Sequence, residues 1–101
     1  MSIATELSPD EKSVTIQISG RFDFSVHQEF MQAYKAFAKG EMRFVVDLSE
    51  ADYLDSSAMG MLLQLREHSA KAADGVILKN GNESVQDVLR IANFGKLFTI
   101  Q

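Results

Sequence analysis

Apolar and polar residues alternate with a period of two from Val14 to Ser19, which predicts a β-strand with one buried face and one wet face. A weaker extended segment, Ile3 to Leu7, precedes it, and the turn residues Ser8 to Glu11 between the two predict a hairpin. Gly20 is expected to end the second strand, and Arg21 to Phe24 to form a loop. The polar positions of the alternation imply that one side of the sheet stays solvated near this strand.

Three stretches further along carry apolar residues three or four positions apart, which is the spacing of an amphipathic helix. The first helix is expected to be capped by Ser25 and closed by Gly40, and the second to run from about Ser57 to Ala73. Ser84 is expected to open the third, with Asp87 as a near capping box, and Asn93 and Gly95 to stop it. The stripes are Val26, Phe30, Ala33, Tyr34 and Phe37; Ala58, Met61, Leu62, Leu65, Ser69, Ala72 and Ala73; and Val85, Val88, Leu89 and Ala92.

Short apolar runs separate these helices. Phe44 to Leu48 is interpreted as a central strand, and Leu97 to Ile100 is interpreted as a last edge strand. Val76 to Leu78 is typical of a parallel strand that is covered on both faces. The order is β-β-α-β-α-β-α-β, and parallel crossovers of this kind are right-handed almost without exception. We therefore predict one α/β domain over residues 1–101, with an open mixed sheet of four to five strands and helices mainly on one face.

Composition excludes several kinds of chemistry. The 101 residues contain no cysteine, so disulfides, thiolate metal sites and thiol catalysis are ruled out. A net charge of −4 argues against nucleic-acid binding. No His/Asp/Glu cluster has metal-ligand spacing and no glycine-rich phosphate loop is present, so neither a metal nor another cofactor is expected. The absence of a secretory segment or a long apolar run predicts a cytoplasmic protein without membrane insertion, and the small acidic domain is expected to be a monomer when free.

The second predicted helix has a flank that fits neither its buried nor its wet side. Met59 and Leu63 lie four residues apart there, while Gly60, Gln64 and Glu67 point outward. One interpretation is that a neighbouring helix covers the flank, because most apolar helix surface is core. The other is a docking surface for a partner, which a flexible methionine thioether suits.

Ser56 lies where this helix begins, and its residue type favours an N-cap. Capping is compatible with regulation, because a phosphate at a helix N-terminus meets free backbone N–H groups and the positive end of the dipole. There it would leave the fold intact while adding about 1.5 to 2 negative charges beside Asp52 and Asp55. A loss of about 3 kcal/mol would weaken an acidic or apolar partner's binding roughly a hundredfold. Residue chemistry alone does not separate Ser56 from Ser57.

Residues 55–63, Asp-Ser-Ser-Ala-Met-Gly-Met-Leu-Leu, closely resemble the D-S-S-G-L-G-x-L-L signature of the STAS family. Residues 44–49 look like that family's central strand, and Gly20-Arg21-Phe22-Asp23 is similar to its G-x-L-D loop. The family includes anti-sigma factor antagonists of bacterial partner-switching systems. The resemblance implies that Ser56 is phosphorylated by a serine kinase of the histidine-kinase-like ATPase type, often the anti-sigma factor itself, and that a metal-dependent serine phosphatase reverses the mark. Ala58 departs from the signature, which has glycine there.

The same resemblance places a loop aspartate, matched by Asp23, near the serine; an Asx-type turn is the alternative role for this residue. Phe22 and Phe24 make the loop unusually aromatic and are either exposed anchors for a partner or buried together, since alternation puts them on one side of an extended loop. The full set of expected partner-binding residues is Asp23, Phe22, Phe24, Asp55, Ser57, Met59 and Leu63.

Two other functions compete with a phosphorylation-controlled regulator. An enzyme using Ser56 or Ser57 as nucleophile needs a base, but His68 lies about 18 Å along the same helix, and no G-x-S-x-G elbow is present. We therefore expect that the protein is not an enzyme. We also expect that His27 and His68 lie on the surface. STAS domains also serve as accessory subunits of transporters and lipid-transport ATPases. The intact Asp-Ser-Ser motif favours the regulator and leaves open whether it controls a sigma factor, biofilm formation or motility.

Overall fold

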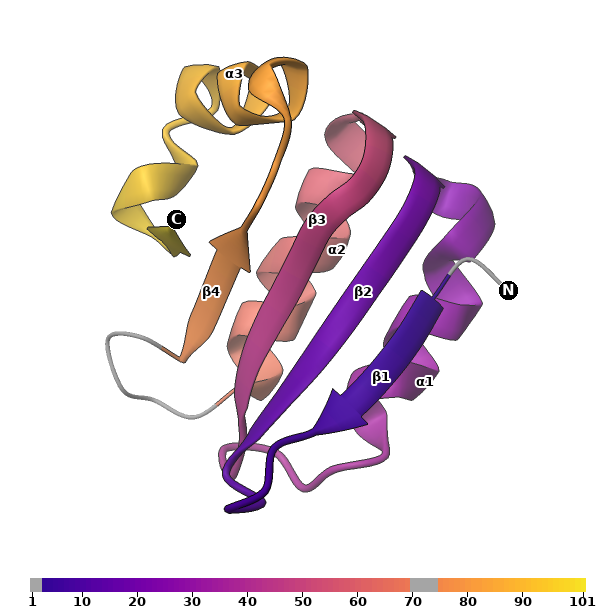
Figure 1. The fold of residues 1–101 in the computed structure, drawn as a ribbon, viewed down its shortest axis with the longest axis vertical. Helices are drawn as coiled ribbons and strands as arrows, with labels where there is room; N and C mark the ends of the chain where they lie inside the picture. Colours follow the sequence, from indigo (N-terminus) through magenta and orange to yellow (C-terminus); the bar gives the residue numbers. More distant parts are fainter. Residues whose placement is uncertain (1–2, 70–74) are drawn as a thin grey trace.

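A computed structural model describes residues 3–69 and 75–101 and shows a five-stranded sheet in the order β1-β2-β3-β4-β5 (Figure 1). The strands are β1 (Ile3–Leu7), β2 (Ser13–Phe22), β3 (Arg43–Leu54), β4 (Val76–Lys79) and β5 (Thr99–Ile100). The helices are α1 (His27–Lys35), α2 (Ser56–His68) and α3 (Glu83–Ile91), with the short 3-10 turns η1 (Phe24–Val26) and η2 (Phe94–Lys96).

β1 and β2 form the predicted antiparallel hairpin, and every later strand is parallel to its neighbour. Each crossover moves one strand along the sheet in the same direction, so right-handed connections place consecutive helices on the same face. α1 and α2 accordingly lie together behind the sheet in Figure 1. The predicted mixed sheet with helices mainly on one face is confirmed. Within the described part of the chain, no helix is long and apolar enough to cross a membrane.

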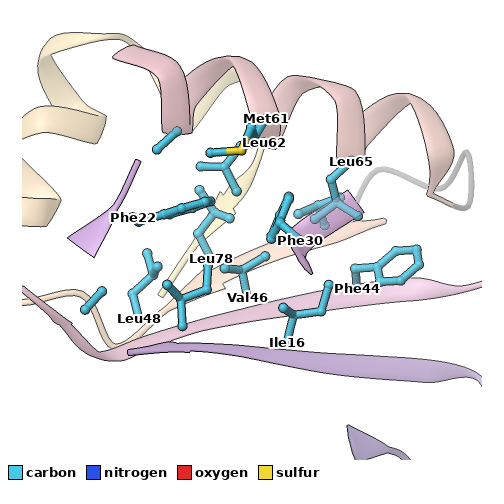
Figure 2. Packing of buried hydrophobic residues seen from close by; sticks show 14 of the residues in the cluster. Ile16, Phe22, Phe30, Phe44, Val46, Leu48, Met61, Leu62, Leu65 and Leu78 are labelled. Carbon is cyan, nitrogen blue, oxygen red and sulfur yellow. The ribbon is translucent and has the colours of Figure 1, made fainter. Parts of the chain in front are cut away.

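The core lies between this helical layer and the sheet (Figure 2). Alternation in β2 buries Val14, Ile16 and Ile18 completely, while Thr15 and Gln17 on the open face stay half-buried. The predicted inner face of α2 is also confirmed for its described members, Ala58, Met61, Leu62, Leu65 and Ser69, all of which are buried. The predicted members Ala72 and Ala73 lie outside the described residues.

The end of the second strand was predicted two residues too early. Gly20 does not terminate β2, because the strand continues until Phe22 pairs with Leu54 of β3. Register shifts occur between Gln17 and Ser19 and between Gly20 and Arg21, and Gly20 has a φ of +78°. A glycine in this conformation is typical of a β-bulge, so it bends the strand where a break was expected. Arg21 and Phe22 therefore belong to the sheet and not to a loop.

Several predicted helix boundaries also differ. η1 precedes α1, which ends at Lys35, so Gly40 (φ +84°) lies in the following turn and does not close the helix. α2 begins one residue earlier than predicted and ends at His68, where the backbone of Ser69 turns to an extended conformation. In β4, Ile77 is half-buried, so that strand is covered on one face and not on both. The predicted last edge strand is present but confined to Thr99–Ile100.

Two glycines of this framework provide opposite stability tests. Gly20→Ala is expected to destabilise the fold by about 1–2 kcal/mol, because a Cβ strains the left-handed backbone that the bulge needs. Gly60→Ala is expected to stabilise it by up to about 1 kcal/mol, because Gly60 lies inside α2 with open space where a Cβ would be. Urea unfolding of both variants measures the two changes. Equal shifts of the same sign would contradict the bulge assignment.

Candidate functional site

The start of α2 lies at the edge of the sheet where β2 and β3 both end (Figure 1). These strands are parallel, and the pairing of Phe22 with Leu54 brings their ends into register. Asp23 and Asp55 each follow one of these two paired residues directly. The carboxyl ends of parallel strands are the usual place for sites in open α/β sheets, which makes this edge the first candidate.

The residue that caps α2 is Asp55. Its Oδ1 accepts hydrogen bonds from the backbone N–H groups of Ser57 (3.0 Å) and Ala58 (3.1 Å) and from the Ser57 hydroxyl (2.6 Å). The expectation that Ser56 is the N-cap is therefore wrong, because the preceding carboxylate already satisfies the donors that a serine would have reached.

Ser56 and Ser57 differ in a way that the sequence did not reveal. Ser57 is half-buried and its hydroxyl donates to Asp55, so it is part of the cap. Ser56 is the first residue of α2 and exposed, and its hydroxyl has no hydrogen-bond partner among the described residues. Of the two hydroxyls, the one on Ser56 is therefore available to an incoming enzyme without breaking the cap.

The electrostatics of the cap favour an ionised Asp55. The pKa of its carboxyl is lowered chiefly by the hydrogen bond from the Ser57 hydroxyl, and further by the N–H groups of Ala58 and Ser57. Partial desolvation and the negative charge of Asp23 oppose this lowering. The influence of Asp23 agrees with the register, in which the two aspartates directly follow the paired residues Phe22 and Leu54.

Asp23 is a cap as well, for the turn η1. Its Oδ1 accepts from the N–H (3.0 Å) and the hydroxyl (2.5 Å) of Ser25, and the hydroxyl contact is the main cause of its lowered pKa. The prediction that Ser25 caps this element is wrong, since Ser25 donates to the cap and does not form it. Of the two roles considered for Asp23, the Asx-type turn is confirmed, and its place near Ser56 stays a prediction.

Alternation predicted that Phe22 and Phe24 lie on the same side of the chain, but the structure buries one and exposes the other. Phe22 ends β2 with 0% of its surface exposed and packs against Phe30, with ring centroids 5.2 Å apart. The turn that Asp23 caps then redirects the chain, so Phe24 is 66% exposed and stacks on the His27 ring. Phe22 is therefore not a surface anchor, whereas Phe24 is accessible.

The flank of α2 that carries Met59 and Leu63 is partly covered. Met59 packs against the core, whereas Leu63 remains 40% exposed. On the same helix, Arg66 Nε donates to the carbonyl oxygen of Leu97 at 3.0 Å and so ties the C-terminal segment to α2. Met59 is therefore partly a core residue, and Leu63 is the accessible member of the pair.

Among the described residues, neither histidine is hydrogen-bonded to Ser56. His68 lies among aromatic rings, with Nε2 2.7 Å from the carbonyl oxygen of Phe37 and its ring centroid 5.1 Å from that of Tyr34. His27 is half-buried beside Phe24, so the expectation of two surface histidines is wrong. Both line a groove of about 480 Å³ between α1 and α2. Over residues 3–69 and 75–101, no group of three or more His, Asp or Glu is placed to hold a metal.

Sequence reasoning missed Arg21 and Tyr53 at this edge. Arg21 Nε lies 3.3 Å from Asp23 Oδ2, and its guanidinium carbon is 3.9 Å from the centroid of the Tyr53 ring. The two residues are register partners in β2 and β3. The only signal for this contact in the sequence was the basic residue Arg21 directly after Gly20, and Arg21 was expected to lie in a loop.

The Asp55 cap predicts a specific dependence of stability on pH. Asp55→Ala is expected to cost about 1 kcal/mol of unfolding free energy at pH 7, and Asp55→Asn less, because the amide oxygen still caps. Because the folded pKa of Asp55 lies below its unfolded value, its contribution is present above the unfolded pKa and is lost as pH falls through the folded pKa. Urea unfolding between about pH 6 and pH 2 is therefore expected to show a shallower acid loss in Asp55→Asn. Identical acid profiles would contradict the cap.

The fold and the capped, serine-bearing helix start define a STAS-type α/β domain. The chain belongs to the family described as "Mlab, STAS domain", whose model matches residues 5–99. It is 48% identical over 100 residues to a STAS-domain containing protein of Pseudomonas aeruginosa (strain UCBPP-PA14), with 99% of each chain covered.

Solved structures share the fold at lower identity. A Thermotoga maritima protein proposed to be an anti-sigma factor antagonist has a TM-score of 0.79 at 20% identity, covering 97% of this chain and 84% of that one. The anti-sigma factor antagonist SpoIIAA in its unphosphorylated form has a TM-score of 0.64 at 19% identity, covering 98% and 86%. SpoIIAA in its phosphorylated form, a Bacillus cell fate determinant, has a TM-score of 0.63 at 20% identity, covering 98% and 90%. The predicted STAS membership and the antagonist-like fold are confirmed.

Proposed function

We propose that this chain is a non-enzymatic, cytoplasmic regulator that binds a protein partner when Ser56 is free and releases it when Ser56 is phosphorylated. The partner class follows from the family resemblance: a serine kinase of the histidine-kinase-like ATPase type that also acts as anti-sigma factor or controls another response. A metal-dependent serine phosphatase would restore the binding form. SpoIIAA, whose fold this chain shares, is itself described in an unphosphorylated and a phosphorylated form.

The proposal rests on the different roles of Ser56 and Ser57 at the start of α2. Asp55 and Ser57 hold the start of α2, and Ser56 projects an exposed hydroxyl without a hydrogen-bond partner among the described residues. A phosphoryl group can therefore be added without dismantling the helix cap. It would also be favoured by the dipole at a helix N-terminus.

The surroundings of Ser56 supply a docking surface. Phe24 and Leu63 offer exposed apolar side chains, Asp55 directly precedes the serine, and Asp23 follows the end of the neighbouring strand. Aromatic residues frequently dominate the energy of protein interfaces. A phosphate beside two carboxylates would raise the cost of desolvating this surface, so binding would be lost through charge and not through unfolding.

The experiment that tests phosphorylation is peptide mapping of the protein from the cells that make it. Tryptic peptides containing both serines are fragmented to assign the site. We expect phosphate on Ser56 and unmodified Ser57. Phosphate on Ser57 alone would contradict the assignment, and its absence from both under all growth conditions would favour an accessory subunit of a transporter or lipid-transport ATPase.

A further inference from the structure

Phosphorylation at Ser56 would add negative charge at the ends of β2 and β3, where several acidic side chains already lie. Asp23 and Asp55 directly follow the paired strand ends Phe22 and Leu54, and exposed Asp52 lies three residues before Asp55 in β3. A phosphoserine adds about 1.5 to 2 negative charges at pH 7, so the modified site needs a positive partner close by.

Arg21 is placed to be that partner. Its side chain is 62% exposed and is held by two weak contacts, the Asp23 ion pair at 3.3 Å and the face of the Tyr53 ring at 3.9 Å. A solvent-exposed ion pair of this kind contributes little to stability. Arg21 can therefore exchange Asp23 for a stronger anion at small cost.

The register brings this guanidinium toward the modified residue. Arg21 pairs with Tyr53. Asp23 lies two residues after Arg21, just past the end of β2, and Ser56 lies three residues after Tyr53 as the first residue of α2. Arg21 Nε already donates to Asp23 Oδ2, and Asp23 and Asp55 directly follow the paired residues Phe22 and Leu54. The cation therefore lies at the strand ends where Ser56 begins α2.

We propose that Arg21 leaves Asp23 when Ser56 is phosphorylated and becomes the phosphate's counter-charge within the same chain. The inference rests on the proposed function, because it describes how that site responds to modification. Arginine suits the role because its planar guanidinium forms paired hydrogen bonds with phosphate oxygens. The move also uncovers the Tyr53 ring and removes the cation from Asp23, which keeps its hydrogen bonds from Ser25. The partner would therefore meet a rearranged surface as well as added charge.

The test uses full-length protein with phosphoserine incorporated at position 56 during synthesis, which requires no cellular kinase. The ³¹P signal is followed from pH 4 to 8 in this protein and in its Arg21→Gln, Arg21→Lys and Arg90→Gln versions. We expect Arg21→Gln to raise the titration midpoint by about half a pH unit, since the dianion loses a cation about 4 Å away. Arg21→Lys, which keeps the charge, is expected to recover most of the difference.

Arg90→Gln is the matched control, because Arg90 is also an exposed arginine paired with a nearby aspartate, Asp87 at 2.9 Å. It is expected to leave the midpoint unchanged. The Tyr53 ring protons give a second readout, shifting on phosphorylation in the parent protein and not in Arg21→Gln. The ring signals of His27, which stacks on Phe24, are followed separately.

An unchanged midpoint in Arg21→Gln, or equal changes in Arg21→Gln and Arg90→Gln, would overturn the proposal. Either result would leave the phosphorylation-controlled binding itself standing, since that is judged from peptide mapping and partner affinity. Conversely, failure to find phosphate in cells would remove the proposed function while the titration still reported on the guanidinium.

Discussion

Replacing Ser56 with glutamate is expected to weaken binding to the kinase-type partner by about a hundredfold, corresponding to about 3 kcal/mol. The added carboxylate would lie beside Asp55 and near Asp23, on the surface that the partner must desolvate. Ser56→Ala is expected to bind as tightly as the unmodified protein and to remain bound in the presence of kinase and ATP. Titration calorimetry with the purified partner measures both affinities.

Two matched variants separate this effect from unspecific ones. Ser84→Glu adds the same charge to the first turn of a different helix, α3, and is expected to leave the affinity unchanged. Ser57→Ala removes a cap contact and is expected to reduce stability more than binding. If Ser84→Glu weakened the complex as strongly as Ser56→Glu did, net charge would be the cause and the site assignment would fail.

Phe22→Ala is expected to cost about 3–5 kcal/mol of unfolding free energy, a large part of the 5–15 kcal/mol typical of a small domain. The ring is fully buried between the sheet and α2, against Phe30 (Figure 2). Its removal leaves a cavity at the point where β2 ends and the site begins. Urea unfolding followed by circular dichroism measures the loss.

The neighbouring aromatic residue provides the control for this prediction. Phe24→Ala is expected to change stability by less than about 0.5 kcal/mol, because most of the side chain is exposed, and to weaken partner binding instead. A reversed pattern, with Phe24→Ala destabilising and Phe22→Ala tolerated, would contradict the description of this edge.

The sequence predicted the fold where the physical signal is local and repeated. The period-two alternation from Val14 to Ser19 and the turn before it were sufficient for the hairpin. The helical stripes identified the buried faces, including Leu62 and Leu65 of α2. Right-handed crossovers between sequential strands then left one arrangement of helices on the sheet.

Helix starts were predicted less well, for one consistent reason. The serines at 25, 56 and 84 were each considered as caps, but the acceptors are Asp23, Asp55 and Asn82, one or two residues earlier. Serine, aspartate and asparagine cap helices about equally well, so residue type could not choose among adjacent candidates. The spacing Asp-x-Ser was the available signal, since Asp23 and Asp55 both accept the N–H two residues later.

The site was predictable in position but not in detail. The family signature marked the start of α2, yet whether Phe22 or Phe24 is exposed depends on a turn that alternation does not foresee. Arg21 and Tyr53 meet through the register between two strands, which depends on the bulge at Gly20. Distances between residues on different strands depend on tertiary packing, so they could not be predicted from the sequence alone.

The most direct test compares the protein carrying phosphoserine at position 56 with the unmodified protein, measuring partner affinity by calorimetry and unfolding free energy by urea on the same samples. The account predicts an affinity about a hundredfold lower and an unfolding free energy changed by less than about 1 kcal/mol. Equal affinities, or an affinity lost only because the modified protein unfolds, would contradict it.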